Sequence, residues 1–541
     1  MTVPESTLPT LISPHNRALP LLTLTDLRIL ETQAAAALPQ HTLMSRAGKA
    51  AASYLQEQIT RDTSIEKSKH KVWVVAGPGN NGGDALIVAA ELHRAGFAVD
   101  LCMPLEVKPD DARWALDTAR AAGVAITSTP PASLESYTWL VDGMFGIGLT
   151  RPLEGVFATI ARQLSQRTKT KSRRGGVLAL DTPSGLDSDT GTVVGEKPDQ
   201  GGARSENQND GAAVHATHTI TFIGAKPGLF TAQGRDLAGT VTVAPIGIDS
   251  TTRTAVQLNA PALFADFLPP RDFATNKGTF GSLAVVGGDT GMCGAPILAS
   301  RAALYTGAGK VHVALLGDGA PPYDPPHPEL MLHAIDDLPL DKMDALAVGC
   351  GMGLRDIATR VMHDVLPLDV PKLFDADALN LISTDPSLAA QVTARGVQGD
   401  PCVLTPHPLE AARLLGTDAP GVQRNRLAAA RALAARFAAV VVLKGTGTVI
   451  AAPDGRVAIN PTGNAALATG GTGDVLGGII GALLAQHLPR YEAALAGVYL
   501  HGLAADTLSA QGHGPAGLTA GELAPMVRTL LNRMFYPATG G

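Results

Sequence analysis

The sequence is poor in cysteine, aromatic residues and charge. Its 541 residues include four cysteines, and aromatic and charged residues make up 4% and 17%. No cysteine pairs as CxxC, which excludes a zinc knuckle or a redox motif of that spacing. The net charge of -6 provides no basic field for a nucleic acid or a membrane surface. We therefore expect neither as a partner, and we expect free, buried thiols in a reducing compartment at Cys102, Cys293, Cys350 and Cys402.

Long apolar runs are missing too. No segment approaches the roughly 18 apolar residues of a membrane span. The N-terminal "MTVPESTLPTLISPHN" lacks the basic start and apolar core of a signal peptide. A cytoplasmic protein is therefore expected. A chain of 541 residues is too long for one core, so we expect two or more domains.

Glycine and proline are abundant, with 59 and 38 residues, and indicate an α/β protein with many tight turns. Helical spacing covers 24–60, and alternating strand and helix patterns then predict βαβ units in a parallel sheet. The pattern breaks near the proline-bearing "LPPRDFATNKG" and resumes, so we place domains at 1–255 and 256–541. One large sheet is the alternative, against which the duplicated glycine-rich turns argue. The expected strands are 72–76, 98–103, 138–142 and 177–181, then 282–287, 311–315, 345–349, 372–375, 402–405 and 440–443; the expected helices of the first series are 84–95, 110–122 and 153–166.

Two polar segments interrupt the first series. They are "SQRTKTKSRRGG", before Val177, and "GEKPDQGGARSENQNDG", from Gly195 to Gly211. Neither has apolar periodicity, so we expect both to be surface loops.

The stretch "VVAGPGNNGGDALIVAAEL" joins an apolar strand to a helical pattern that begins near Ala85. Its four glycines would let backbone N–H groups approach an anion, and the start of the helix adds partial positive charge. A pyrophosphate is the ligand that fits such a turn, although the spacing is not GxGxxG. An ordinary βα turn is the structural alternative.

Two later strand ends carry an acid followed by glycines. "VDGMFGIGLTRPLEG" places Asp142 at a strand end, and "LALDTPSGLDSDTG" places Asp181 there with Ser184 beyond it. The carboxyl ends of neighbouring parallel strands meet at one edge of a sheet, where ligands bind. Together with the first glycine-rich turn, these strand ends predict a site.

These motifs, followed by "TITFIGAKPG", resemble the epimerase domain of the NAD(P)H-hydrate repair enzymes over most of residues 20–250. The resemblance implies a Rossmann-like three-layer αβα domain that interconverts the R and S forms of NAD(P)HX, the nicotinamide cofactor hydrated at C6. It implies that Asp181 touches the hydrated ring and that a potassium ion binds Asn81, Asp142 and Ser184. Ala85 departs from the family, which usually has glycine there. The residues implied to line the cofactor are Asn80, Asn81, Gly82, Gly83, Asp84, Gly146, Ile147, Gly148, Leu149, Thr150, Arg151, Pro152 and Asp181.

A second set of strand-to-glycine turns follows in the second series. "GSLAVVGGDTGMCGAP" leads into a helix near Gly294, "AVGCGMG" forms another turn, and "FDADALNLI" places Asp375 and Asp377 at a strand end. In "NPTGNAALATGGTGDVLGGIIGALLA", Asp474 follows three glycines at the start of a long apolar helix. Backbone N–H groups there would form an anion hole beside a possible general base. A helix N-cap is the structural alternative for Asp474.

The set "KGTFG", "GCGMG", "DADAL", "TPHPLE" and "GTGD" is similar to the ADP- or ATP-dependent NAD(P)HX dehydratases over about 260–535. The resemblance implies a ribokinase-like α/β domain in which a nucleotide, with magnesium, activates the C6 hydroxyl. It implies Asp474 as the catalytic base. His407 could instead begin a helix, Glu410 could be a first-turn charge, and the role of Asp289 stays open. The residues implied to bind the nucleotide are Lys444, Gly445, Thr446, Gly447, Thr448, Asn464, Thr469, Gly470, Gly471, Thr472, Gly473 and Asp474, and those implied to face the hydrated cofactor are Ala295, Gly353, His407, Pro408, Leu409, Glu410, Ala411, Ala412 and Arg413.

The favoured hypothesis is one chain with two enzymes for one damaged cofactor, assembled as a homo-oligomer. A small-molecule kinase is the first alternative, because the GTGD loop occurs in such kinases too, but it leaves the first domain unexplained. An inactive binding module at 1–250 is the second, against which the intact Asp142, Asp181 and Ser184 argue. The sequence does not determine whether ADP or ATP is preferred as co-substrate, or whether NADHX or NADPHX is preferred as substrate.

Overall fold

The structure, a computed structural model, describes residues 11–536 apart from 63–65, 67–68, 170–174, 197–210, 250–253 and 319–321. The chain forms two compact units, unit 1 from Met1–His15 and Leu19–Val256 and unit 2 from Asn16–Ala18 and Gln257–Gly541. The strands form two separate sheets, so the alternative of one large sheet is wrong. Most of the second polar segment and the middle of the first lie outside the described residues.

Unit 1 contains a seven-stranded sheet in the order β3-β2-β1-β4-β5-β6-β7. All its neighbouring strands are parallel, as predicted. Chain order reverses between β1 and β4, and ligands bind at the carboxyl ends of strands beside such a point. The strands are β1 (Lys71–Ala76), β2 (Ala98–Cys102), β3 (Ala125–Thr127), β4 (Trp139–Gly143), β5 (Gly176–Leu180), β6 (His218–Phe222) and β7 (Thr240–Ala244).

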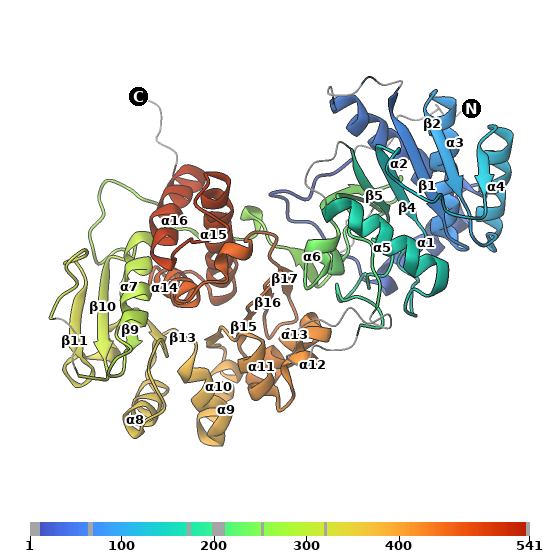
Figure 1. Ribbon diagram of the computed structural model, residues 1–541. Coiled ribbons are helices and arrows are strands. Elements are labelled where there is room, and N and C mark those ends of the chain that lie inside the picture. Colours follow the sequence, from blue (N-terminus) through green and yellow to red (C-terminus); the bar gives the residue numbers. More distant parts are fainter. Residues whose placement is uncertain are drawn as a thin grey trace. The chain divides into compact units, whose positions relative to one another are not determined.

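Helices cover both faces of this sheet, which confirms the three-layer αβα prediction. Successive side chains of a strand point to opposite faces. Val72, Val74 and Ala76 of β1 therefore pack in one core with α2, α3 and α4, whereas Trp73 and Val75 pack in another with α5. Figure 1 shows these helices around the sheet. Their bounds are α2 (Thr42–Arg61), α3 (Asn80–Arg94), α4 (Asp110–Ala121) and α5 (Gly155–Lys169).

Two helix boundaries differ from the prediction. The helical pattern at 24–60 divides into α1 (Leu24–Ala37) and α2, because the backbone turns at His41 with φ of 65°. Helix α3 begins at Asn80 and not at 84. The first N–H groups of a helix have no intrahelical acceptor, and the N-cap Gly79 has no side chain that could accept from them.

Unit 2 contains a ten-stranded sheet in the order β11-β10-β9-β12-β13-β14-β15-β16-β17-β8. Its strands are parallel from β11 to β15, and β15, β16 and β17 are antiparallel. Chain order reverses between β9 and β12. The strands are β8 (Val256–Leu258), β9 (Ser282–Gly287), β10 (Lys310–Leu315), β11 (Met331–Ala334), β12 (Ala345–Val348), β13 (Lys372–Phe374), β14 (Val403–Leu404), β15 (Val440–Leu443), β16 (Val449–Ala451) and β17 (Val457–Ile459).

One core of unit 2 lies between this sheet and helices α7, α14, α15 and α16, and it includes Leu283 and Val285 of β9. Figure 1 shows α8 to α11 on the other side of the sheet from α14 to α16. The second α/β series therefore also forms three layers. The helices are α7 (Gly294–Thr306), α8 (Asp356–Val365), α9 (Asp377–Thr384), α10 (Pro386–Val397), α11 (Pro408–Leu415), α12 (Ala419–Arg424), α13 (Arg426–Phe437), α14 (Thr472–Ala485), α15 (Arg490–Ala510) and α16 (Ala520–Phe535).

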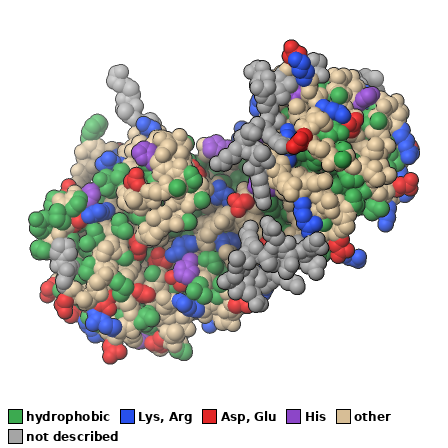
Figure 2. Space-filling view, in the orientation of Figure 1, with side chains coloured by type: hydrophobic (Ala, Val, Ile, Leu, Met, Phe, Trp, Pro, Cys, Tyr) green, Lys and Arg blue, Asp and Glu red, His purple; other side chains and the backbone are tan. Residues whose placement is uncertain are grey.

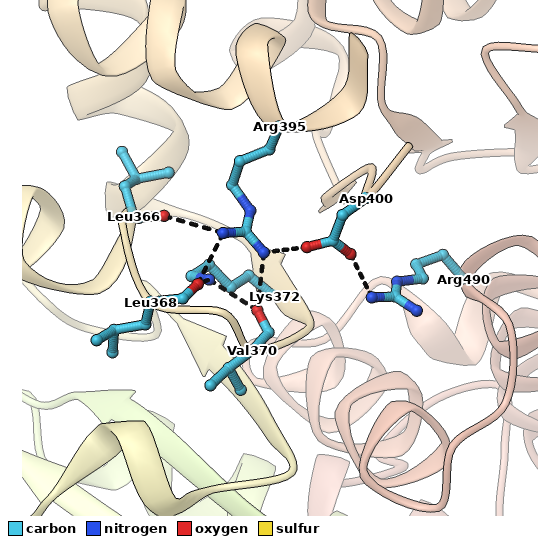
Figure 3. A network of polar contacts seen from close by, with 7 residues as sticks. All are labelled: Leu366, Leu368, Val370, Lys372, Arg395, Asp400 and Arg490. Atoms are coloured by element: carbon cyan, nitrogen blue, oxygen red, sulfur yellow. Dashed lines mark hydrogen bonds and ion pairs between the residues drawn. The ribbon is translucent and has the colours of Figure 1, made fainter. Parts of the chain in front are cut away.

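A polar network stabilises the segment 366–371, which leads into β13 (Figure 3). Arg395 donates to the carbonyls of Leu366, Leu368 and Val370 and pairs with Asp400, which also binds Arg490. Lys372 donates to two of the same carbonyls, and burial lowers its pKa to about 8. Lys372 is the first residue of β13, so this network lies at the end of the strand opposite to Asp375 and is structural.

The mixture of charges on the surface and the burial of the cysteines largely agree with what the composition predicts. On the visible face, acidic and basic side chains are mixed with neutral and apolar ones (Figure 2). All four cysteines are free; Cys102, Cys350 and Cys402 are buried, and Cys293 is half-buried, so the prediction of burial is wrong there. Within the described part of the chain, every helix is too short or too polar to cross a membrane.

Candidate active sites

Unit 1 has a cavity of about 560 Å³ at the carboxyl ends of β1, β4, β5 and β6. The predicted residues Asn80, Asn81, Asp84, Asp181 and the turn 146–149 line it. Helix α1 forms another wall with one face, through Leu24, Leu27, Arg28, Glu31, Thr32 and Ala35. The predicted strand ends therefore meet at one cavity, which has the size of a small-molecule site.

The glycines of the first turn are needed for two different reasons. A Cβ on Gly77 would lie 1.7 Å from the Met144 carbonyl oxygen, and one on Gly82 would lie 1.8 Å from the Gly77 carbonyl oxygen. Here the protein's own backbone makes the close approach. At Gly79 a Cβ would meet nothing within 4 Å, and this residue lines the cavity beside the open N-terminus of α3. The turn thus combines tight packing with a free set of N–H donors.

Asp142, Ser184 and Asn81 surround the turn after β4. The buried Asp142 carboxylate accepts bonds from Ser184 Oγ at 2.6 Å, Ser184 N at 2.8 Å and Met144 N at 3.2 Å. Burial raises the pKa of Asp142 to about 6. Asn81 is buried, and neither atom of its side-chain amide has a hydrogen-bond partner among the described residues. An unpartnered buried amide costs free energy unless another ligand satisfies it.

Asp181 is held in a fixed orientation at the cavity. It has a φ of 65°, which is unusual for a residue with a side chain. Its Oδ1 lies 2.8 Å from Nζ of Lys226, and among the described residues its Oδ2 accepts one long bond of 3.4 Å, from Ile147 N. Sequence analysis missed Lys226; its signal is a single lysine inside the otherwise apolar "TFIGAKPG".

Three more carboxyl groups lie at or near the cavity. Burial, together with the charges of Asp181, Glu31 and Asp111, raises the pKa of Asp84 well above its usual range. Loss of hydration and the charge of Asp181 raise the pKa of Glu31 as well. Groups with perturbed pKa values in a cleft are typical of functional sites.

Some predicted residues do not line this cavity. Gly82 and Gly83 are buried behind it, where a Cβ on Gly83 would collide with Met44. Thr150, Arg151 and Pro152 are exposed beyond the lining residues of the turn at 146–149.

The "DSDTG" segment anchors helix α1, which sequence analysis did not foresee. Asp187 closes the segment by accepting from Asp189 N, Thr190 N and Thr190 Oγ1 at 2.8–3.0 Å. Asp189 in turn accepts from Leu24 N at 2.8 Å, at the start of α1. This motif therefore positions one wall of the cavity.

In unit 2, Lys444 joins the ends of β13 and β15. Its Nζ donates to the buried Asp375 carboxylate at 2.6 Å and lies 3.6 Å from where a Cβ on Gly473 would be. The predicted strand-end acid, the lysine of "LKGTGT" and the glycines before α14 are therefore neighbours. The buried Arg426, which sequence analysis missed, supports the turn by donating to the carbonyls of Leu443 and Lys444 at 3.1 Å.

Asp474 is the third residue of α14, whose N-cap is Gly471 with φ of 89°. The N-cap alternative for Asp474 is therefore wrong. Burial, and less strongly the charges of Asp375 and Asp377, raise the pKa of Asp474. Cys350 lies beside it, and burial together with the Asp474 charge raises the pKa of this thiol well above its usual range. A half-buried carboxyl thus stands at the exposed loop 468–470.

The structural alternatives for His407 and Glu410 do hold, as part of one capping box. His407 is the N-cap of α11, its Nδ1 accepts from Leu409 N at 3.1 Å, and Glu410 accepts from His407 N at 2.8 Å. Burial raises the pKa of Glu410 to about 7 despite the charge of Lys444. Ala411 and Ala412 are buried, whereas Pro408 is half-buried and Leu409 and Arg413 are exposed.

Asp289, whose role was open, ties two of the strand-end turns together. Its carboxylate forms a bidentate pair with Arg355, with Nε at 2.6 Å, and its N–H donates to the Gly351 carbonyl at 2.7 Å. Gly353 N also donates to Asp377, at 2.8 Å. These contacts fix Gly353 and the loop before Ala295. Of the predicted nucleotide residues, Asn464 is held by Asp506, and Thr472 donates to the carbonyls of Leu467 and Thr469.

Two family profiles match the chain. One, described as NAD(P)H-hydrate dehydratase, matches residues 283–527, and the other, described as YjeF-related protein N-terminus, matches residues 40–228. Together they cover the two units that carry the sites.

Curated relatives match over nearly the whole chain. The bifunctional NAD(P)H-hydrate repair enzyme Nnr of Escherichia coli is 36% identical over 520 residues, which cover 94% of this chain and 93% of that protein. The ADP-dependent (S)-NAD(P)H-hydrate dehydratase of Neisseria meningitidis is 50% identical over 264 residues, 48% of this chain and 88% of that protein. A crystal structure of the ADP/ATP-dependent NAD(P)H-hydrate dehydratase of Bacillus subtilis is 33% identical and covers 51% of this chain and 98% of that chain, with a TM-score of 0.45.

Proposed function

The chain belongs to the family of bifunctional NAD(P)H-hydrate repair enzymes, and from this premise we propose that unit 1 epimerises R- and S-NAD(P)HX and unit 2 dehydrates the S form. The observation that carries the proposal is the pair of strand-end sites within one chain. The first has a carboxylate at a cavity, and the second has a carboxyl beside a lysine and a glycine-rich helix start.

Epimerisation inverts the configuration at C6 without net proton transfer. We place Asp181 Oδ2 at the C6 hydroxyl. The carboxylate takes the hydroxyl proton as the C6–N1 bond breaks, and N1 keeps the electron pair, which the conjugated carboxamide delocalises. The C6 aldehyde then presents its other face to N1, the bond re-forms, and the carboxyl returns the proton to oxygen. The N–H groups at the start of α3 would hold the pyrophosphate.

A potassium ion fits the donors around the turn after β4. Asn81, Asp142 and Ser184 supply amide, carboxylate and hydroxyl oxygens, the donors that a hard cation prefers. The unpartnered Asn81 amide and the buried Asp142 carboxylate are groups that such an ion would satisfy. The ion would supply positive charge beside the pyrophosphate.

The potassium proposal predicts a selective loss. Asp142→Ala should weaken potassium binding and slow epimerisation of NADHX, while dehydration of pure S-NADHX stays at the wild-type rate because its site lies in unit 2. Crystals of the variant grown in potassium, with anomalous scattering measured from a thallium soak, would report the ion. Full occupancy in the variant would show that Asp142 is not a ligand. Asp117→Ala, which removes an exposed acid of unit 1, is the matched control.

In unit 2 we propose that the nucleotide transfers its terminal phosphoryl group to the C6 hydroxyl oxygen. Asp474 takes the hydroxyl proton, the new O–P bond forms, and the bridging O–P bond breaks. The C6–O bond then breaks and phosphate leaves with its electron pair. The departing phosphate takes a proton from C5, and the electrons of the C5–H bond form the C5=C6 double bond of NAD(P)H. Lys444 and the N–H groups at the start of α14 would hold the phosphates, with magnesium and with ADP or ATP as donor.

The test is conversion of mixed R,S-NADHX with ADP or ATP, followed by NADH absorbance. We expect complete conversion, because unit 1 supplies the S form that unit 2 consumes. Arrest near the S fraction would show an inactive epimerase, once slow spontaneous epimerisation is subtracted. Absence of any NADH would contradict the dehydratase. Parallel reactions with NADPHX, and with ADP against ATP, measure the preferences.

The remaining proposals concern the state of the protein. We place the boundary between the activities at 255/256, and we expect a cytoplasmic homo-oligomer. Light scattering coupled to size exclusion measures the oligomer, and a monomer at micromolar concentration would contradict it.

A further inference from the structure

We propose that Lys226 is a positioning residue for epimerisation, which selects the oxygen of Asp181 that meets the C6 hydroxyl. This inference rests on the proposed epimerase function of unit 1. It concerns a lysine to which neither the motif resemblance nor the family comparison gives a role.

The burial of Lys226 is the first observation. The residue is 0% exposed to solvent, although it borders the cavity from the turn after β6. A buried ammonium group costs free energy unless a counter-charge and hydrogen bonds compensate for its lost hydration. Asp181 Oδ1, at 2.8 Å, is that counter-charge. Lys226 and Asp181 therefore form an ion pair in which each side chain depends on the charge of the other.

The hydrogen bonds of the ammonium group exclude direct proton donation. Lys226 Nζ has three N–H donors. Three acceptors lie close: Thr221 Oγ1 at 2.5 Å, Asp181 Oδ1 at 2.8 Å and the Phe222 carbonyl at 3.1 Å. The Gly224 carbonyl follows at 3.5 Å. No donor remains for a substrate, so Lys226 acts on the reaction through Asp181.

The two oxygens of Asp181 are consequently different. Oδ1 is occupied by Lys226 and receives a long bond from Phe222 N at 3.4 Å. Within the described part of the chain, Oδ2 has a single long bond, from Ile147 N, and it lies 2.9 Å from where a Cβ on Gly146 would be. The missing side chain at Gly146, a cavity residue, leaves room at Oδ2. Lys226 therefore turns one defined oxygen toward the substrate.

The surrounding charge explains why the carboxylate needs a cation. Glu31 of α1 and Asp84 of α3 both interact with the Asp181 charge, and Asp111 of α4 interacts with Asp84. Lys226 and Arg28 offset part of this negative charge at Glu31. Without Lys226, the repulsion from the other acids would not be balanced at Asp181, and Oδ1 would lose the partner that fixes the carboxylate.

The experiment measures epimerisation and dehydration separately in Lys226→Met, Lys226→Arg and Thr221→Val. Lys226→Met should lower kcat for epimerisation at least 100-fold with KM changed less than threefold, since substrate contacts remain. Lys226→Arg should recover part of kcat, because it restores the charge. Lys108→Met, on the exposed surface of unit 1, should match the wild type.

Dehydration of pure S-NADHX is the internal control for an intact chain. A kcat within threefold of the wild type in a folded Lys226→Met would overturn the proposal, as would a loss confined to KM. If unit 1 of that variant fails to fold, Thr221→Val decides, since it keeps the charge but removes one anchor of Nζ. It should lower kcat five- to tenfold at unchanged melting temperature; unchanged kcat would overturn the proposal. No epimerisation in the wild type would instead reject the underlying function.

Discussion

Asp474 is the proposed catalytic base of the second activity. It stands at the third position of α14, next to the lysine and glycines proposed to hold the nucleotide. Asp474→Asn keeps the size of the side chain and removes the base, so dehydration of S-NADHX should fall about 10²–10⁴-fold. Epimerisation should be unchanged. Steady-state rates of both reactions test this, with the exposed Asp341→Asn as control; full dehydration by Asp474→Asn would refute the assignment.

Glu410 predicts a pH dependence of stability. Burial raises its pKa from 4.5 to about 7 in the folded protein, so folding favours the protonated form. Its stabilising contribution is complete below pH 4.5 and is lost as pH rises through 7. Glu410→Gln is neutral at every pH. Between pH 5 and pH 8, the free energy of unfolding of the variant should therefore rise relative to that of the wild type by on the order of 2 kcal/mol, since each pKa unit is worth about 1.4 kcal/mol.

Urea unfolding of unit 2 at these two pH values measures the gain. Glu329→Gln, at an exposed glutamate, is the control and should show no such difference. An equal free energy of unfolding for wild type and Glu410→Gln at both pH values would contradict the shift.

Individual site residues were predictable where they follow a strand. Asp142, Asp181 and Asp375 could be placed because the carboxyl ends of parallel strands meet at one edge. Their cationic partners could not. Lys226 lies 45 positions from Asp181 and Lys444 lies 69 from Asp375, and nothing in the spacing pairs them. Such pairs depend on the order of the strands in the sheet, which local sequence does not contain.

Helix α1 is the element that the structure adds to the first site. It buries only Leu27 among its 14 residues, and yet one of its faces lines the cavity. Its start is held by the Thr23 capping box and by Asp189. Asp189→Ala should therefore destabilise unit 1 by about 1 kcal/mol, the usual value of a lost cap. The KM for epimerisation should rise several-fold while dehydration is unchanged.

Thermal unfolding and initial rates on R-NADHX check both effects. Asp117→Ala on the exposed face of α4 is the matched control, since it removes an acid of the same unit that caps nothing. A wild-type KM in Asp189→Ala would show that α1 does not depend on this anchor.

The elements themselves were predictable to different degrees. Strands β1, β9 and β15 match their predicted ranges within one residue, because each is a short apolar run bounded by turn residues. The start of α3 was placed four residues late, since Asn and Gly favour turns in isolation. The antiparallel β16 and β17 were not foreseen. They are three residues each, too short to show a period.

At the scale of the whole molecule, each unit has its own sheet, its own core and its own site. We propose that each step uses groups of its own unit alone, so that S-NADHX passes from the first site to the second. If it passes through solution, two chains with complementary defects should repair each other. Asp181→Asn alone should stop near the S fraction of mixed R,S-NADHX, and Asp474→Asn alone should produce almost no NADH. An equimolar mixture of the two variants, with ADP or ATP present, should convert the substrate completely, and the yield should not depend on protein concentration. Conversion of the mixture that stalls at the S fraction would show that the S form made by unit 1 reaches the second site only within one chain.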